Sequence, residues 1–299
     1  MSKKVISATI TPLFEDGSLD REGLKNIFER NIRHGINGVF LFGSMGEWGS
    51  FSDAFKEETV ELSSQIIGKR MELLTGINAT SLPLTLELMK NYQKYDFSAY
   101  VYMPPARTTS RDPLKSALTV LDSADRPVYL YHCPPNNNIN FTLEQFETLM
   151  QHPNLKGIKN SSSNMWLRRE LLLLKEDMKS NVLLLEGQEW AVDEALLAGM
   201  DGMVCGMGAL AAKPMVEIAR AIEQGDYKKA VELQYVLIRI YHGVYGKNIE
   251  NVWNGQKYAL MKLGLCESAY TIAQEMSLLT PEAMTRIEKC LAEYKDILD

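Results

Sequence analysis

Eight short apolar runs alternate with eight longer helical patterns, and this repeat constrains the fold more than any other feature of the sequence. The runs are rich in β-branched residues and lack a strict apolar–polar alternation, which is typical of a parallel sheet that is covered on both faces. We predict strands at residues 5–12, 38–43, 72–78, 98–105, 127–135, 155–162, 182–189 and 202–210. We predict the helices that follow them at residues 20–35, 52–68, 82–95, 113–124, 142–151, 165–177, 192–199 and 213–225.

Eight strand–helix units within the first 225 residues predict an α/β protein with a closed (β/α)₈ TIM barrel. An open doubly wound sheet is the alternative, and it is disfavoured because no G-x-G-x-x-G motif follows the first strand. After residue 225 only helical patterns occur. We therefore expect a catalytic barrel domain over residues 1–225 and a C-terminal helical extension over residues 226–299. The helix at 165–177 carries paired charges, so we expect it to be a solvated amphipathic helix.

The composition is that of an ordinary globular protein, with 45% hydrophobic and 23% charged residues. A formal net charge of −6 argues against a nucleic-acid-binding surface. No apolar run is long enough to cross a membrane, and the start MSKKVISATITP is too short and too polar for a signal peptide. The four cysteines lack metal-ligand spacing, which predicts reduced thiols, no metal site and a cytoplasmic location.

The stretch LKGIKNSSSN at residues 155–164 ends a predicted strand on a lysine, Lys159. A lysine at a strand end is usually a surface residue. In a (β/α)₈ barrel, however, the carboxyl ends of the strands form the active site, and a lysine there is partly desolvated. Desolvation disfavours the ammonium form, and the free amine can attack a carbonyl to form a Schiff base. Tyr131 ends the neighbouring strand, so its phenol could pass protons at the same centre.

Three motifs lie at such strand ends: GSMGE (43–47), YHCP (131–134) and GIKNSS (157–162). In this order and with these separations they resemble the dihydrodipicolinate synthase/N-acetylneuraminate lyase family. The similarity runs from ATITPLFEDGSLD near the N-terminus through the C-terminal helices. It implies a Schiff-base lyase of the class I aldolase type that acts on pyruvate-derived 2-oxo acids. The resemblance also implies that no metal or organic cofactor is needed and that the protein is a homotetramer.

The resemblance implies roles for individual residues. Lys159 matches the Schiff-base lysine of the family, and Tyr131 matches the tyrosine that shuttles protons. Ser44 and the backbone N–H of Met45 match the loop that holds the carboxylate of the 2-oxo acid. Gly187 and Glu189 match positions that contact a sugar-acid tail. Val204 matches a backbone contact near the pyruvyl group.

Three positions depart from the synthase branch of that family. Met45 replaces a second threonine of the Gly-x-Thr-Gly-Glu loop, and its thioether cannot donate a proton. Ala106 stands where a neighbouring subunit would supply a tyrosine, and Asn136 stands where an arginine would bind a dicarboxylate tail. The amides of the run PPNNN (134–138) suit hydroxyl groups better than a second carboxylate, although such a run is as readily a turn.

We therefore expect the substrate to be a 2-oxo-3-deoxy sugar acid that is cleaved or dehydrated. Two alternatives stay open. One is a 4-hydroxy-tetrahydrodipicolinate synthase, and the other is a barrel that binds a 2-oxo acid without turning it over.

Other residues near the predicted strand ends each have a functional and a structural interpretation. Trp48 and Trp190 could wall a substrate pocket or simply pack. Arg107 and Arg111 could bind a substrate carboxylate, or lie in solvent or at a subunit contact. His132 follows Tyr131 in its strand, so its side chain should point away from the barrel axis.

Overall fold

Eight parallel strands close into a barrel in the order of the sequence in the computed structural model, which describes residues 2–106 and 112–299. β1 pairs with both β2 and β8, and this closes the sheet. The strands are β1 (Lys4–Ala8), β2 (Gly38–Leu41), β3 (Glu72–Gly76), β4 (Ala99–Tyr102), β5 (Val128–His132), β6 (Leu155–Asn160), β7 (Leu183–Glu186) and β8 (Gly202–Cys205). The predicted (β/α)₈ barrel is confirmed, and the open doubly wound sheet is excluded.

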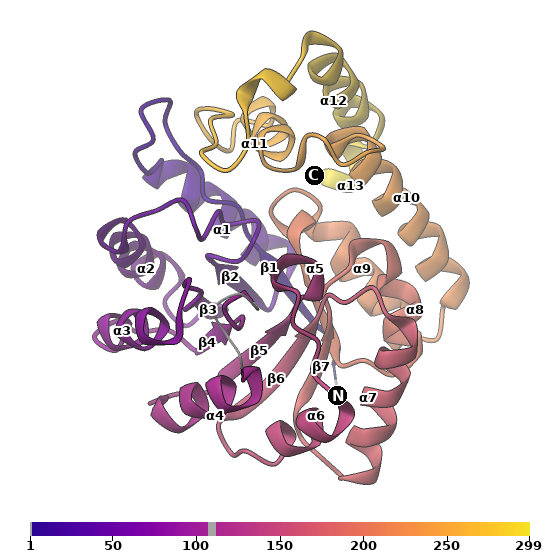
Figure 1. Cartoon of the computed structure of the whole chain (residues 1–299). Coiled ribbons are helices and arrows are strands. Elements are labelled where there is room, and N and C mark those ends of the chain that lie inside the picture. Colours follow the sequence, from indigo (N-terminus) through magenta and orange to yellow (C-terminus); the bar gives the residue numbers. More distant parts are fainter. Residues whose placement is uncertain (1, 107–111) are drawn as a thin grey trace.

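Helices follow the strands and cover the outside of the barrel (Figure 1). They are α1 (Arg21–His34), α2 (Asp53–Ile67), α3 (Leu82–Tyr92), α4 (Pro113–Ser123), α5 (Pro134–Asn137), α6 (Leu143–Met150), α7 (Met165–Asp177), α8 (Val192–Leu197) and α9 (Ala212–Glu223). Side chains fix their ends: Ser52 caps α2, and Thr142 and Gln145 form a capping box at the start of α6. The short α5 is not predicted because four residues are too few to show a helical period.

Four more helices follow the barrel, namely α10 (Tyr227–Tyr245), α11 (Val252–Lys262), α12 (Pro281–Glu293) and α13 (Lys295–Leu298). The expected boundary at residue 225 falls in the turn between α9 and α10, where Gly225 has a left-handed φ of 75°. α10 packs along α9 and α12, and α11 packs on α10 and α12. Figure 1 shows these helices on one side of the barrel, with the C-terminus among them. No helix in the described part of the chain is long and apolar enough to cross a membrane.

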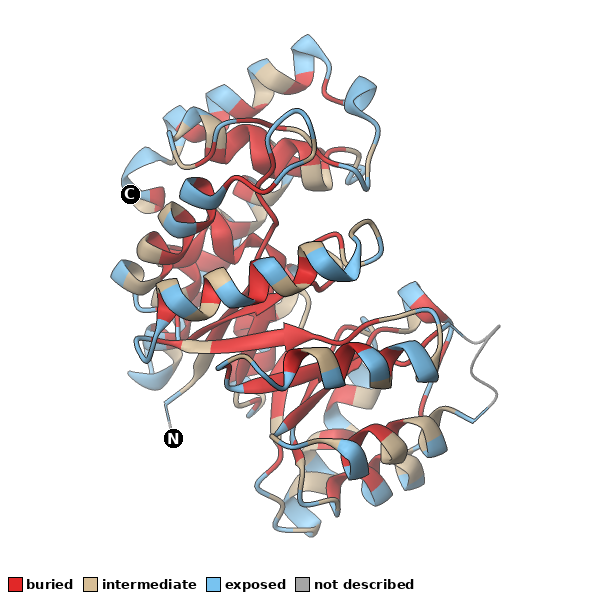
Figure 2. Ribbon diagram, turned by 90° about the vertical axis from the view of Figure 1, so that its left-hand side faces the viewer, coloured by how far each residue is buried: buried red, intermediate tan, exposed pale blue. Residues whose placement is uncertain are grey.

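Two hydrophobic cores stabilise the barrel. The larger one lies between the outer face of the sheet and the helices, whose outer faces are exposed (Figure 2). The smaller one fills the barrel and consists of Ile6, Ala8, Phe40, Leu74, Ala99, Val101, Met103, Tyr129, Tyr131, Cys133, Leu185 and Val204. Large inward side chains fill the barrel interior, so a ligand is expected at the carboxyl ends of the strands rather than inside the barrel.

The outer face of α7 differs from the expected solvated charged surface. Met165, Trp166 and Leu173 are 62%, 73% and 55% exposed. Arg168 is instead buried and forms an ion pair with Glu186 at 3.2 Å. The expectation is therefore wrong for part of this helix, because apolar side chains rather than charges occupy much of its exposed face.

Candidate active site

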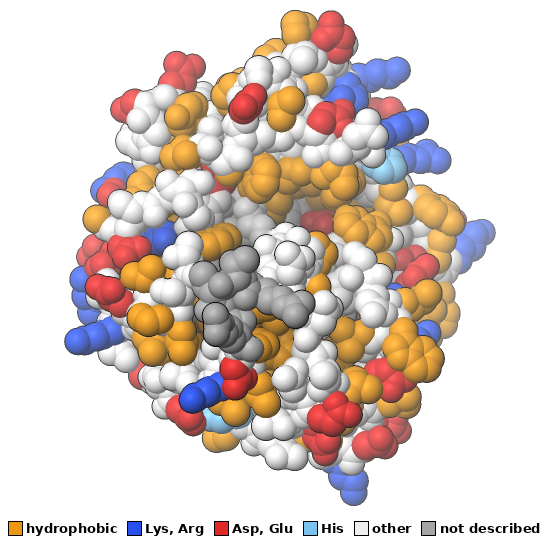
Figure 3. Space-filling model, viewed as in Figure 1, with side chains coloured by type: hydrophobic (Ala, Val, Ile, Leu, Met, Phe, Trp, Pro, Cys, Tyr) orange, Lys and Arg blue, Asp and Glu red, His pale blue; other side chains and the backbone are white. Residues whose placement is uncertain are grey.

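A cleft of about 720 Å³ opens at the carboxyl ends of the strands, a size that suits a small organic molecule. Figure 3 shows a hollow on this face of the molecule, with hydrophobic side chains along the edge that adjoins the C-terminal helices. The structure brings most of the predicted site residues together in the wall of the cleft: Ser44, Met45, Tyr131, Asn136, Lys159, Gly187 and Glu189. Val204 lies instead in the core inside the barrel, and Gly206, two residues further on, lines the cleft.

Lys159 projects from β6 into the barrel, and its register partner on β5 is Tyr131. The lysine is 5% exposed, and its Nζ lies 4.0 Å from the ring centroid of Tyr131 and 5.3 Å from that of Phe40. Among the described residues no carboxylate lies within ion-pair distance of this amine. Burial lowers the pKa of Lys159, which favours the free amine. The two ring faces can still stabilise the positive charge of a protonated imine.

Two glycines lie near this lysine at positions where a side chain would clash with the barrel interior. A Cβ on Gly157 would lie 2.7 Å from the ring of Tyr129, which occupies the layer below Lys159. A Cβ on Gly187 would lie 1.9 Å from Ser161 Oγ and 3.0 Å from Lys159 Cε. The predicted substrate position Gly187 therefore has a steric reason to be glycine, because any side chain there would clash with Ser161 and crowd the stem of Lys159.

A chain of polar groups leads from Asn136 to Tyr131. Asn136 Nδ2 donates to Ser44 Oγ at 2.7 Å, and Ser44 Oγ lies 3.4 Å from Tyr131 Oη. Since Ser44 accepts from the amide, its own proton is available to the phenol. Burial raises the pKa of Tyr131, so the phenol keeps its proton and can donate it. The hydroxyl beside Tyr131 thus comes from Ser44, and Met45 does not remove it.

The asparagine run at 136–138 was predicted either to face the substrate or to form a turn, and its three residues differ in this respect. Only Asn136 faces the cleft. Asn137 Nδ2 donates to the backbone oxygen of Pro104 at 2.9 Å, and Asn138 ends α5 in the left-handed region with φ of 56°. The turn interpretation holds for the second and third residues, and the first contributes to the site.

Glu189 is buried at the cleft wall, in the turn that follows β7. Its Oε1 accepts from the backbone N–H groups of Gly206 and Met207, in the loop after β8. Burial raises the pKa of Glu189, and the nearby Lys159 opposes this shift. The carboxylate therefore ties two cleft loops together, and its Oε2 takes no part in these two bonds.

The other expectations have mixed outcomes. Trp48 and Trp190 both line the cleft. His132 points outward, as predicted, with Nδ1 3.1 Å from Asn160 Oδ1 and its ring against Phe146. Arg107 and Arg111 lie outside the described residues. All four cysteines are buried and unpaired, and the described residues hold no cluster of three or more potential metal ligands.

The sequence pattern misses the contribution of the C-terminal helices. Tyr241 of α10 and Trp253 of α11 line the cleft, and Trp253 Nε1 donates to the backbone oxygen of Ser44 at 2.9 Å. The ring of Tyr241 packs edge-on against Trp190, with centroids 5.9 Å apart. Helical periodicity identifies which side of a helix is buried, but it does not identify the loop that this side meets.

Comparisons with known proteins match the chain over almost its whole length. A family model described as the dihydrodipicolinate synthetase family matches residues 1–293. The 4-hydroxy-tetrahydrodipicolinate synthase of Bartonella bacilliformis is 27% identical over 269 residues, which cover 89% of this chain and 90% of that protein.

Solved structures agree in fold. The dihydrodipicolinate synthase of Bacteroides thetaiotaomicron has a TM-score of 0.88 at 25% identity, covering 97% of this chain and 98% of that chain. A prophage protein of the dihydrodipicolinic acid synthase family from E. coli, solved in complex with pyruvate, has a TM-score of 0.87 at 21% identity and covers 98% of each chain.

Proposed function

The chain belongs to the dihydrodipicolinate synthetase family of Schiff-base lyases, and on that premise we propose that Lys159 forms an imine with pyruvate or a pyruvate-derived 2-oxo acid. The observation that carries the proposal is the amine itself. It is buried, its pKa is lowered, no described carboxylate pairs with it, and a buried phenol lies beside it. Burial favours the free amine, which is the nucleophilic form of lysine.

In the proposed reaction Tyr131 acts in turn as an acid and as a base. The amine of Lys159 attacks the C2 carbonyl, Tyr131 protonates the departing hydroxyl, and loss of one water gives a protonated imine. For a substrate with a C4 hydroxyl, the C3–C4 bond then breaks and its electron pair moves toward the imine nitrogen, giving an enamine. The phenolate of Tyr131, a strong base because the pKa is raised, takes the C4 hydroxyl proton as the aldehyde leaves. Tyr131 then donates this proton to C3 of the enamine. Water hydrolyses the resulting imine, and this releases pyruvate, frees the amine of Lys159 and returns a proton to the phenolate.

Borohydride trapping with pyruvate tests the imine directly. We expect a reduced pyruvyl adduct on the peptide that contains Lys159, detected by intact-protein and peptide mass spectrometry. A folded protein that gives no adduct would contradict the proposal. If calorimetry then still detected pyruvate binding, the barrel that binds a 2-oxo acid without turnover would be the better account.

We propose an uncharged, hydroxylated tail for the substrate, as in a 2-oxo-3-deoxy sugar acid. Among the described residues that line the cleft, Lys159 is the one cationic side chain. Asn136, Gln188 and Ser163 supply amides and a hydroxyl, and Glu189 can accept from a hydroxyl group. A second carboxylate on the substrate would be repelled by Glu189. Within this described lining it would find no cation other than Lys159, which forms the imine.

The names of the relatives favour the alternative, a 4-hydroxy-tetrahydrodipicolinate synthase. A substrate panel separates the two candidates. We expect kcat/KM for 2-oxo-3-deoxy sugar acids to exceed that for pyruvate with aspartate semialdehyde by at least tenfold. This ratio corresponds to a difference of about 1.4 kcal/mol in transition-state stabilisation. Asn136→Arg should shift this ratio toward the dicarboxylate by about tenfold, because it adds a cation at the cleft wall. Asn140→Arg, an exposed position outside the lining, is the matched control. Faster synthase turnover by the unsubstituted protein would instead support the synthase.

We propose a homotetramer, with the exposed apolar side chains of α7, α8 and α10 as one of its interfaces. The members of this surface that carry the proposal are Trp166, Leu173, Leu197, Tyr227, Val231 and Tyr235, each at least 40% exposed. Exposed apolar side chains that form one patch mark association surfaces. α8 and α10 pack against each other, which brings two of these three helices together.

A cytoplasmic location of the protein likewise stays a prediction.

Light scattering after size exclusion tests this interface. We expect the unsubstituted protein to elute as a tetramer and Tyr235→Glu to elute as a smaller species, because a buried unpaired carboxylate disfavours the contact. Lys228→Glu, which changes an exposed charge on the same helix, should keep the tetramer. A monomeric unsubstituted protein, or an unchanged Tyr235→Glu variant, would contradict the assignment.

A further inference from the structure

Three side chains on one face of α11 donate hydrogen bonds to the loops of the cleft. Trp253, Gln256 and Lys257 follow the i, i+3, i+4 spacing and so share a side of the helix. Trp253 Nε1 donates to the backbone oxygen of Ser44 at 2.9 Å, and Gln256 Nε2 donates to that of Gly206 at 3.1 Å. Lys257 Nζ pairs with Glu47 at 2.5 Å. We call these three residues the α11 donor face.

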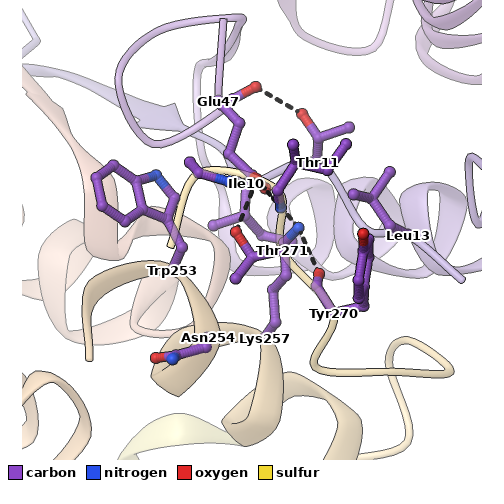
Figure 4. Close-up of polar contacts among 12 residues, drawn as sticks. Ile10, Thr11, Leu13, Glu47, Trp253, Asn254, Lys257, Tyr270 and Thr271 are labelled. Atoms are coloured by element: carbon purple, nitrogen blue, oxygen red, sulfur yellow. Dashed lines mark hydrogen bonds and ion pairs between the residues drawn. The ribbon is translucent and has the colours of Figure 1, made fainter. Parts of the chain in front are cut away.

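The loop after β2 depends on such contacts for its shape. Phe42 and Glu47, which flank Ser44 in this loop, both have left-handed backbones, with φ of 56° and 55°. Residues other than glycine keep this conformation only where surrounding contacts enforce it. The carboxylate of Glu47 is buried and bound on both sides: Lys257 contacts Oε1, while the hydroxyl of Thr271 and the N–H groups of Ile272 and Ala273 donate to Oε2. Figure 4 shows Lys257 extending from α11 toward Glu47, with Thr271 alongside.

The loop after β8 is held in the same way. The N–H of Gly206 donates to Glu189, and its carbonyl oxygen accepts from Gln256. Gln256 is completely buried. The two peptide groups of Gly206 are thus fixed from the barrel side by Glu189 and from α11 by Gln256.

The start of α11 is itself anchored to the segment that follows it. The backbone N–H of Trp253 donates to Gln274 Oε1 at 3.2 Å, and Asn251 Nδ2 donates to the backbone oxygen of Leu278 at 2.5 Å. Asn254 Nδ2 donates to the backbone oxygen of Glu275 at 3.3 Å. The α11 donor face is therefore held in place by residues 274–278, so it can determine the positions of the loops after β2 and β8.

We propose that the α11 donor face positions the two cleft loops for the 2-oxo acid, and that Trp253 is the positioning residue for Ser44. This inference rests on the proposed function, in which Ser44 and the N–H of Met45 hold the substrate carboxylate. Trp253 fixes the carbonyl of the peptide whose N–H belongs to Met45, so its bond sets the direction of that N–H. Displacement of a carboxylate-binding group by about 1 Å has large effects on reactivity.

Trp253→Phe tests the bond because it keeps a ring in the cleft wall and removes the N–H donor. We expect the pyruvate concentration that gives half-maximal trapping to rise about tenfold, while the maximal trapping rate changes less than twofold. We also expect faster hydrogen exchange of the amides in residues 43–49 of the free protein. Tyr95→Phe, which keeps a ring and removes a donor to Glu57 outside the cleft lining, is the control and should change neither. The thermal midpoint of both variants should match that of the unsubstituted protein within a few degrees.

Gln256→Met provides a second, independent variant of similar size without a donor. It should speed exchange in residues 205–208 and leave residues 43–49 less affected. Unchanged half-saturation and unchanged exchange in both folded variants would overturn the positioning role while leaving imine formation by Lys159 intact. If the unsubstituted protein forms no adduct, the proposed function fails, and the exchange data alone decide whether α11 holds these loops.

Discussion

Lys159→Met is expected to abolish the borohydride-trapped pyruvate adduct and to lower turnover by about 10⁴-fold or more, the scale of losing a covalent nucleophile. Methionine is unbranched and apolar, so it can fill the space of the lysine stem between Tyr131 and Phe40. The buried amine has no carboxylate partner among the described residues, so its removal should leave the thermal midpoint unchanged or raise it. The measurements are mass spectrometry after reduction, steady-state kinetics and thermal unfolding.

Lys156→Met is the matched control, because Lys156 lies in the same strand, three residues away, with its side chain exposed. It should form the adduct at the rate of the unsubstituted protein. Adduct formation by Lys159→Met at a comparable rate would show that another amine reacts, and the assignment of Lys159 would be wrong.

The pH dependence of trapping follows from the lowered pKa of Lys159. The free amine reacts, so the rate should fall as pH decreases through the pKa of the folded protein, which lies below the ordinary value of 10.5. The unfolded chain binds this proton more tightly than the folded chain. The contribution of Lys159 to stability therefore rises with pH up to about 10.5 and levels off above it. Comparing the unsubstituted protein with Lys159→Met isolates this contribution.

Lys257→Met is expected to lower the free energy of unfolding by about 3–5 kcal/mol, because it leaves the buried carboxylate of Glu47 without its cation. The side chains of both residues are 0% exposed, so water cannot replace the lost partner. For a chain of this size the thermal midpoint should fall by about 5–8 °C. Glu47→Gln in the same chain should recover part of the loss, because the amide oxygen can still accept from Thr271, Ile272 and Ala273.

Lys262→Met supplies the comparison on the same helix. Lys262 pairs with Glu288 at 2.7 Å, but both side chains are more than 40% exposed. Its removal should cost at most about 1 kcal/mol, since water screens exposed pairs. Equal losses in the Lys257 and Lys262 variants would mean that burial of the Glu47–Lys257 pair does not govern its contribution.

The barrel and the juxtaposition of Tyr131 and Lys159 were predictable because both depend on local pattern. The strands end where turn residues begin, and the barrel topology makes the strands of Tyr131 and Lys159 neighbours. Their direct register follows from the pairing of β5 with β6. The outward direction of His132 follows equally from strand alternation.

Other parts of the site depend on packing that no local pattern encodes. Predicted β8 is longer than the observed strand, which ends at Cys205 and turns at once into a short 3-10 helix (Gly206–Ala209). That turn brings Gly206 to the cleft and leaves Val204 in the core. Trp253 is one aromatic residue in a helix outside the barrel, and its bond to Ser44 joins positions 209 residues apart. Such contacts follow from the tertiary fold alone.

The Glu47–Lys257 pair cannot form until both of its residues have been synthesised. Its two residues are 210 positions apart, so at a synthesis rate of about 5–20 residues per second roughly 10–40 s separate their emergence. A nascent chain that has reached residue 225 already contains all eight strands, while Glu47 still lacks its cation and Ser44 its donor from α11. Lys159 is thus synthesised before the contacts from α11 to the cleft loops can form. The loop after β2 therefore acquires its contacts with α11 only after residue 257 has been synthesised.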